Sequence, residues 1–141
     1  MLIWHEKYET GHATIDTQHK MLVTYINRLE GLLKTTNPTR QECEFIVAMV
    51  EFLEAYVDSH FQFEEQCMDR YRCPAHGKNK QAHQDFIVFF KHFKERYAAE
   101  GFRQDILSEL HKNVHDWILG HILQIDTQLR DCVPKTPPPA A

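Results

Sequence analysis

The sequence predicts an all-α protein, an antiparallel up-down-up-down four-helix bundle preceded by an N-terminal extended arm. Four stretches carry apolar residues spaced three and four positions apart, which is the period of an amphipathic helix. No alternating apolar and polar run between hairpin turn residues supports a strand. Because the connections between the four stretches are short, successive helices must run antiparallel. With 141 residues, the chain has room for one domain.

The four helices are expected in order at residues 14–34, 38–70, 75–98 and 103–131. Asn37 is the expected N-cap of the second helix, with Pro38 at its first helical position. Gly101 is the expected stop of the third helix. Four of the six prolines fall among the last eight residues, so we expect a bundle over 1–133 and a Pro-rich flexible tail over 134–141.

Composition and charge disfavour several classes of protein. Sixteen Lys and Arg against twenty Asp and Glu give a net charge of −4 without a basic stripe, so no nucleic-acid partner is expected. The longest apolar run, Phe86 to Phe90, is far shorter than the roughly 20 residues of a membrane span, so no membrane partner is expected either. The first residues lack the pattern of a secretory signal, which favours the cytoplasm. The four cysteines form no CxxC pair and are expected to be thiols without a disulfide framework.

Histidine is the unusual residue of this chain. One histidine lies on the apolar face of each expected helix, and the four are His19, His60, His83 and His121. Glu64 follows on the same face one turn after the second of them, and Asp126 lies just beyond the fourth. Buried together, these groups need a compensating cation. Imidazoles with two carboxylates suit iron, manganese or zinc and favour a carboxylate-bridged metal pair.

Several motifs are similar to those of a known family. They are Trp4 with Gly11, Ile15-Asp16-Thr17-Gln18-His19, His60-Phe61-Gln62-Phe63-Glu64-Glu65, His83-Gln84-Asp85-Phe86, and Trp117-Ile118-Leu119-Gly120-His121-Ile122 followed by Asp126. In this order and spacing, over about residues 1–131, the chain resembles the bacteriohemerythrins. The resemblance implies a non-haem di-iron centre, bridged by carboxylates and an oxo or hydroxo group, that binds dioxygen.

The resemblance also implies how the ligands divide. His19 and His60 would hold one iron, His83 and His121 the other, and Glu64 and Asp126 would bridge the two. Asp126 follows His121 by five residues, which is about 140° around an ideal helix and a poor spacing for one face. Periodicity therefore does not predict this last pair, and the family resemblance alone carries it.

The chain departs from the family pattern at one ligand position. Where the family has His-x-x-x-His on the third helix, this chain has Asn79 followed by His83. Because an amide oxygen is a weaker ligand for iron than imidazole, we hypothesise that the iron held by His83 and His121 is weaker and more open, with water or Asn79 in the vacant position. The alternative is that Asn79 lies near the surface and touches nothing. His76 is too far along the helix from His83 to replace the missing ligand.

These observations favour a protein that binds dioxygen at two iron ions for storage, delivery or sensing, and that is not an enzyme. Two other classes stay open. An oxidase or peroxidase would use the coordination position that Asn79 leaves open. A module that binds iron without gas chemistry would use the same ligands. The sequence does not decide the oligomeric state.

Overall fold

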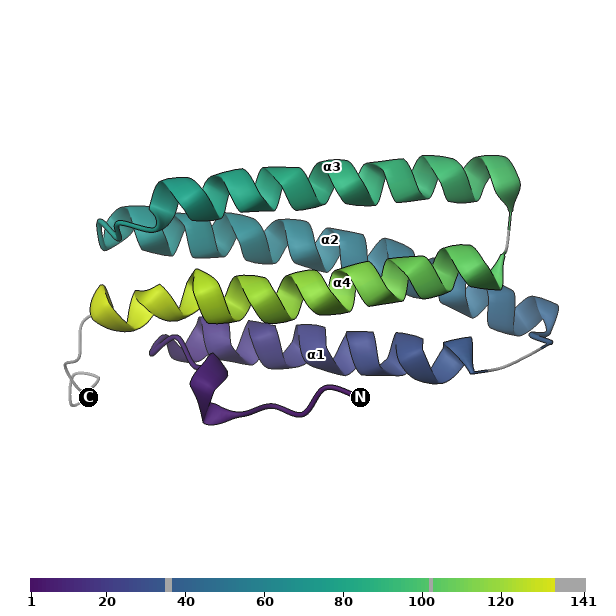
Figure 1. Cartoon of the computed structure of the whole chain (residues 1–141), viewed down its shortest axis with the longest axis horizontal. Helices are drawn as coiled ribbons and strands as arrows, with labels where there is room; N and C mark the ends of the chain where they lie inside the picture. The colour runs from purple at the N-terminus through teal and green to yellow at the C-terminus, as the bar shows by residue number, and fades with distance from the viewer. Residues whose placement is uncertain (35–36, 102, 134–141) are drawn as a thin grey trace.

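The computed structural model describes residues 1–34, 37–101 and 103–133. Within these ranges the chain has four long α-helices and two short 3-10 helices. They are η1 (Glu6–Tyr8), α1 (Ala13–Leu33), α2 (Arg40–Arg70), α3 (His76–Glu100), α4 (Gln104–Gln124) and η2 (Asp126–Asp131). Figure 1 shows the four long helices side by side in alternating directions, with the N-terminal arm along α1. The predicted fold class is confirmed, while the tail expected at 134–141 lies outside the described residues.

The start of α2 differs from the prediction. Its N-cap is Thr39 and not Asn37. The Thr39 hydroxyl accepts from the Glu42 backbone N–H at 3.1 Å, and the Glu42 carboxylate accepts from the Thr39 N–H at 3.2 Å. This reciprocal pair satisfies two backbone donors at the helix start, an arrangement that Asn37 followed by Pro38 does not offer. At the other predicted boundary, Gly101 caps α3 at a φ of +75°, as expected.

The fourth helix ends earlier than predicted. The expected helix over 103–131 stops at Gln124, and the chain continues from Asp126 as the 3-10 helix η2. Ile125 makes the change, with a φ of −115° and a ψ of −58°. A 3-10 helix winds more tightly than an α-helix, so the side chains beyond Ile125 no longer follow the α-helical period. This break between α4 and η2 allows the side chain of Asp126 to point toward that of His121.

A polar layer lies between two apolar clusters. The main core runs along the bundle and includes Leu22, Phe61 and Ile118. A smaller group, the end cluster, consists of Ile15, Cys67, Met68, Cys73, Ala75 and Leu129. On α1, His19 stands between an end-cluster residue and a main-core residue, and Glu64 does so on α2. The sequence thus places the polar side chains of both helices at one level, closed by hydrocarbon on two sides.

Two cysteines correct the expectation of free thiols. The structure joins Cys73, in the turn between α2 and α3, to Cys132, at the end of η2, with 5.4 Å between their Cα atoms. They are 59 residues apart, so only the folded bundle brings them together and local spacing gives no signal. Cys43 and Cys67 are free, as expected.

The N-terminal arm packs against the bundle at two points. The amide of Asn27 on α1 exchanges two hydrogen bonds of 2.8 Å with the backbone of Leu2. The guanidinium of Arg130 on η2 donates to the backbone carbonyls of Lys7 at 2.8 Å, of Glu6 at 3.1 Å and of Glu9. The arm thus runs from the η2 end of the bundle, where residues 6–9 meet Arg130, along α1 to Asn27.

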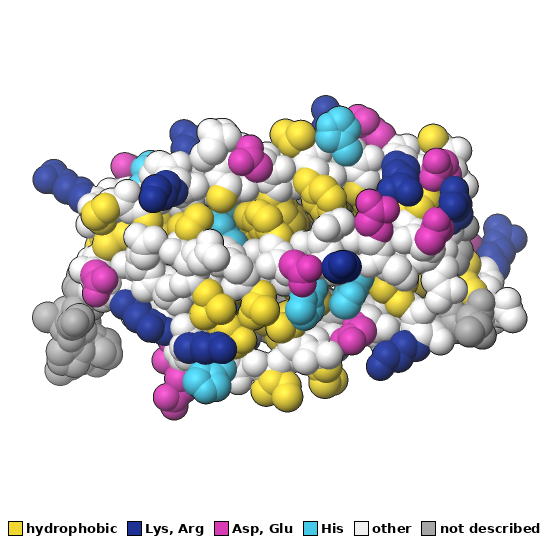
Figure 2. Space-filling view, in the orientation of Figure 1, with side chains coloured by type: hydrophobic (Ala, Val, Ile, Leu, Met, Phe, Trp, Pro, Cys, Tyr) yellow, Lys and Arg dark blue, Asp and Glu magenta, His cyan; other side chains and the backbone are white. Residues whose placement is uncertain are grey.

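The visible surface mixes charges of both signs. Figure 2 shows Lys and Arg interspersed with Asp and Glu, and hydrophobic side chains in the furrows between helices. Among the described residues, no helix combines the length and apolar character needed to cross a bilayer.

Candidate metal centre

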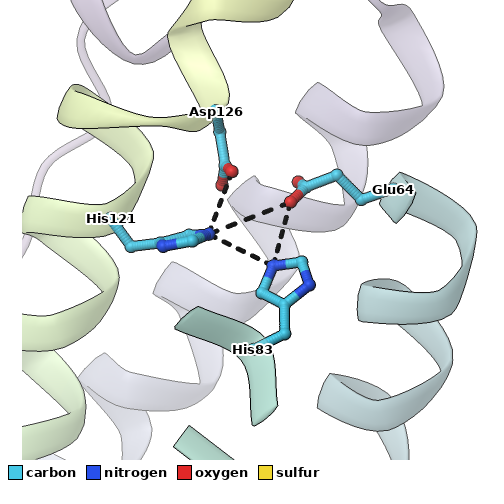
Figure 3. Close-up of side chains that lie close together, drawn as sticks. All are labelled: Glu64, His83, His121 and Asp126. Carbon is cyan, nitrogen blue, oxygen red and sulfur yellow. Dashed lines mark hydrogen bonds and ion pairs between the residues drawn. The ribbon is translucent and has the colours of Figure 1, made fainter. Parts of the chain in front are cut away.

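The structure brings together all six side chains that the sequence predicted as ligands. His19 comes from α1, His60 and Glu64 from α2, His83 from α3, His121 from α4 and Asp126 from η2. Each is at most 6% exposed. We call these six residues the ligand cluster; Figure 3 shows four of them, contributed by α2, α3, α4 and η2, pointing toward one another.

Glu64 lies at the centre of the ligand cluster. Its Oε2 is 3.0 Å from the Nε2 of His19 and 3.3 Å from the Nε2 of His60. Its Oε1 is 3.1 Å from the Nε2 of His83. Each oxygen of this carboxylate therefore faces a different set of imidazoles.

The two carboxylate oxygens of Asp126 also contact different histidines. Its Oδ2 is 3.3 Å from the Nε2 of His19, and its Oδ1 is 3.0 Å from the Nε2 of His121. The imidazoles of His83 on α3 and His121 on α4 also lie close together, with 3.1 Å between their Nε2 atoms. Two carboxylates thus span two histidine pairs.

The donor atoms fit two cations that share one carboxylate. One group of ligand atoms within 4.8 Å of one another comes from Glu64, His83, His121 and Asp126; a second comes from His19, His60 and Glu64. Glu64 belongs to both groups. All donors are imidazole nitrogens or carboxylate oxygens, a set that suits iron, manganese or zinc. The residues present therefore fit a carboxylate-bridged metal pair.

The buried carboxylates and imidazoles shift one another's pKa values. Burial lowers the pKa of His19, but hydrogen bonds with Asp126 and Glu64 outweigh it and raise that pKa to about 10. Burial raises the pKa of Glu64, but hydrogen bonds from His19, His60 and His83 hold it well below its usual value. The imidazoles thus favour the anionic form of Glu64, and the carboxylates favour the protonated form of His19.

Comparison with known proteins decides the family. Residues 10–132 match the hemerythrin HHE cation binding domain. The chain belongs to the hemerythrin family. With the buried ligand cluster, this membership makes it a non-haem iron-binding protein.

Relatives in this hemerythrin family align over most of the chain. The bacteriohemerythrin of Pseudomonas aeruginosa is 30% identical over 132 residues, which cover 94% of this chain and 81% of the relative. That of Stenotrophomonas maltophilia is 29% identical over 133 residues, covering 94% and 82%. That of Clostridium acetobutylicum is 27% identical over 134 residues, covering 93% and 100%.

In this member of the hemerythrin family, outer hydrogen bonds orient two of the histidines. The Nδ1 of His60 lies 2.7 Å from the Oε1 of Gln18, and the Nδ1 of His83 lies 3.1 Å from the Oε2 of Glu65. Because both oxygens can only accept, both Nδ1 atoms donate and both Nε2 atoms are left for the centre of the site. Gln18 and Glu65 were not predicted; each directly precedes or follows a ligand in sequence, and that adjacency is the only signal.

Aromatic rings cover two of the imidazoles. Phe61 stacks on His83, with 3.8 Å between centroids and 4° between planes. Trp117 stacks on His121, with 4.3 Å and 10°. Such contacts fix ring orientation and keep water from this side of the hemerythrin site. Helical periodicity does not distinguish Phe61 from an ordinary core residue. Its contact with His83 becomes visible only in the folded bundle.

Asn79 is fully buried in the same site. Its Nδ2 donates to the Oε1 of Glu64 at 2.9 Å, and its Oδ1 lies 2.7 Å from the Nε2 of His121. The alternative that Asn79 lies near the surface and touches nothing is therefore wrong. His76 belongs to neither group of ligand atoms.

Proposed function

We propose that this hemerythrin-family chain binds dioxygen reversibly at a carboxylate-bridged di-iron centre. The proposal rests on the two carboxylate oxygens of Glu64, which contact different histidines. Oε2 faces His19 and His60, while Oε1 faces His83. A carboxylate placed in this way can bridge two metals. Membership of the hemerythrin family, with bacteriohemerythrins among the relatives, supports the same proposal.

The ligands divide between two irons. His19 and His60 would hold one iron, His83 and His121 the other, and Glu64 and Asp126 would bridge them. When bound, the iron pair supplies the redox chemistry that lets dioxygen be taken up and released.

The chain's own contribution is a dry and rigid surrounding. The main core and the end cluster close the ligand cluster from two sides, and Phe61 and Trp117 cover two of the imidazoles. Excluding water limits the supply of protons to the site and so slows side reactions that need them. Gln18 and Glu65 hold protons at the outer Nδ1 atoms and so keep the inner Nε2 atoms free to bind metal.

An oxidase or peroxidase would need the open position that the sequence suggested at Asn79. Asn79 instead fills that position with hydrogen bonds to Glu64 and His121. This observation favours binding over turnover, and we therefore propose storage, delivery or sensing as the role.

The test is the ultraviolet-visible spectrum of iron-loaded protein through cycles of air and argon, together with an iron count. We expect two irons per chain and an absorption band that appears in air and disappears under argon. His60→Ala should abolish the band, whereas His92→Ala, at an exposed position of α3, should leave it unchanged. An air-insensitive spectrum would refute dioxygen binding, and steady peroxide consumption with added reductant would identify a peroxidase instead.

A further inference from the structure

Asn79 combines two properties that a merely structural residue rarely has. It is a neutral polar side chain with 0% exposure, and both of its polar atoms contact the ligand cluster and not the backbone. A buried amide is tolerated only where its donors and acceptor are satisfied. The site therefore has a use for this amide that hydrocarbon could not serve.

The chemistry of its neighbours fixes how the amide is turned. The Oε1 of Glu64 accepts a hydrogen bond from the Nδ2 of Asn79 at 2.9 Å. The amide NH₂ must therefore face Glu64, which turns the oxygen toward the imidazoles. That oxygen lies 2.7 Å from the Nε2 of His121, itself 3.1 Å from the Nε2 of His83. Three donor atoms thus converge with the Oε1 of Glu64.

We propose that Asn79 is a metal ligand through its Oδ1 and that it completes the donor set of the His83–His121 iron position. This inference rests on the proposed di-iron function. One residue serves two purposes here, since its oxygen binds the cation while its NH₂ donates to the bridging carboxylate. An imidazole at this position cannot do both, because its second nitrogen lies on the far side of the ring.

The consequence is that Asn79 acts on one of the two positions. Each position has two imidazoles and an oxygen of Glu64, and the Asn79 oxygen lies only at the His83–His121 position. Removing that oxygen should therefore weaken the binding of one iron and leave the other unchanged.

The test is an anaerobic calorimetric titration of metal-free protein with iron(II), with iron counted after gel filtration. Wild type should bind two irons per chain. Asn79→Ala should weaken the binding of one iron by at least about tenfold and leave the other unchanged, since even outer partners of metal ligands change affinity about 10- to 100-fold. Asn113→Ala, at an exposed position of α4, is the matched control and should change neither affinity.

Two further variants separate a ligand from a hydrogen-bond donor. Asn79→Asp keeps an oxygen ligand but loses the donor to Glu64, so a ligand role predicts stronger binding of one iron and a donor role predicts weaker binding. Asn79→His should strengthen the binding of that iron and add one imidazole per iron pair in X-ray absorption spectra. Two irons whose affinities are the same in wild type and Asn79→Ala would refute the ligand role alone. Uptake of a single iron by wild type would refute the di-iron function and the second site with it.

Discussion

Removing the Cys73–Cys132 disulfide should lower the stability of the metal-free protein by about 4 kcal/mol. The bond closes a loop across a separation of 59 residues. In the chain-entropy description, the unfolded chain loses about 2.1 + 1.5R ln n cal/mol/K, which for this loop is about 14 cal/mol/K, or about 4 kcal/mol at 25 °C. The free energy is expected to come from the unfolded state, so the helical content of the folded protein should not change.

The assay is guanidinium chloride unfolding of metal-free protein, followed by far-ultraviolet circular dichroism. With an m-value of about 4 kcal/mol/M, Cys132→Ser should lower the midpoint by about 1 M. Reductant should shift wild type by the same amount and leave the variant unchanged. Cys43→Ser, which removes a free and half-buried thiol, is the control. Equal midpoints for wild type and Cys132→Ser under oxidising conditions would refute the reasoning.

Three further predictions concern pH, capping and packing. Because the pKa of His19 is raised to about 10 from 6.5, its contribution to the stability of metal-free protein is complete below pH 6.5 and is lost as the pH rises through 10. Thermal melts from pH 6 to 10 should show this decline in stability, and a flat profile would contradict it. Thr39→Ala removes the capping box of α2 and should cost about 1 kcal/mol in denaturant unfolding, while Arg40→Ala beside it should cost much less. Leu107→Ala, at a fully buried core position of α4, should lower the free energy of unfolding by about 2–5 kcal/mol. A loss under about 1 kcal/mol would show that neighbouring side chains close the cavity.

The histidines and Glu64 could be predicted from the sequence because each lies on a face that helical periodicity identifies. Their common depth follows from the short α2–α3 connection, which fixes His60 and His83 at similar distances from it. Asp126 could not be found in this way. It lies beyond the break at Ile125, where the α-helical period no longer holds, and only the family resemblance suggested it.

The remaining differences have physical causes of two kinds. The capping box was visible as Thr39-Arg40-Gln41-Glu42, but Asn37 followed by Pro38 gave a competing local signal, and only the hydrogen bonds decide between them. The disulfide and the contacts of Asn79 depend on residues far apart in the chain. Propensity and spacing carry no information about such pairs, so they become predictable only once the packing of α2, α3 and η2 is known.

The position of Asp126 on η2 bears on how much of the chain iron binding requires. This carboxylate comes from the last described stretch of the chain, and Arg130 anchors that stretch to backbone carbonyls of the first nine residues. A polypeptide that has completed its fourth helix still lacks Asp126, one of the two carboxylates proposed to bridge the irons. The proposed di-iron centre therefore predicts that a chain truncated before residue 126 binds iron poorly even with every histidine in place.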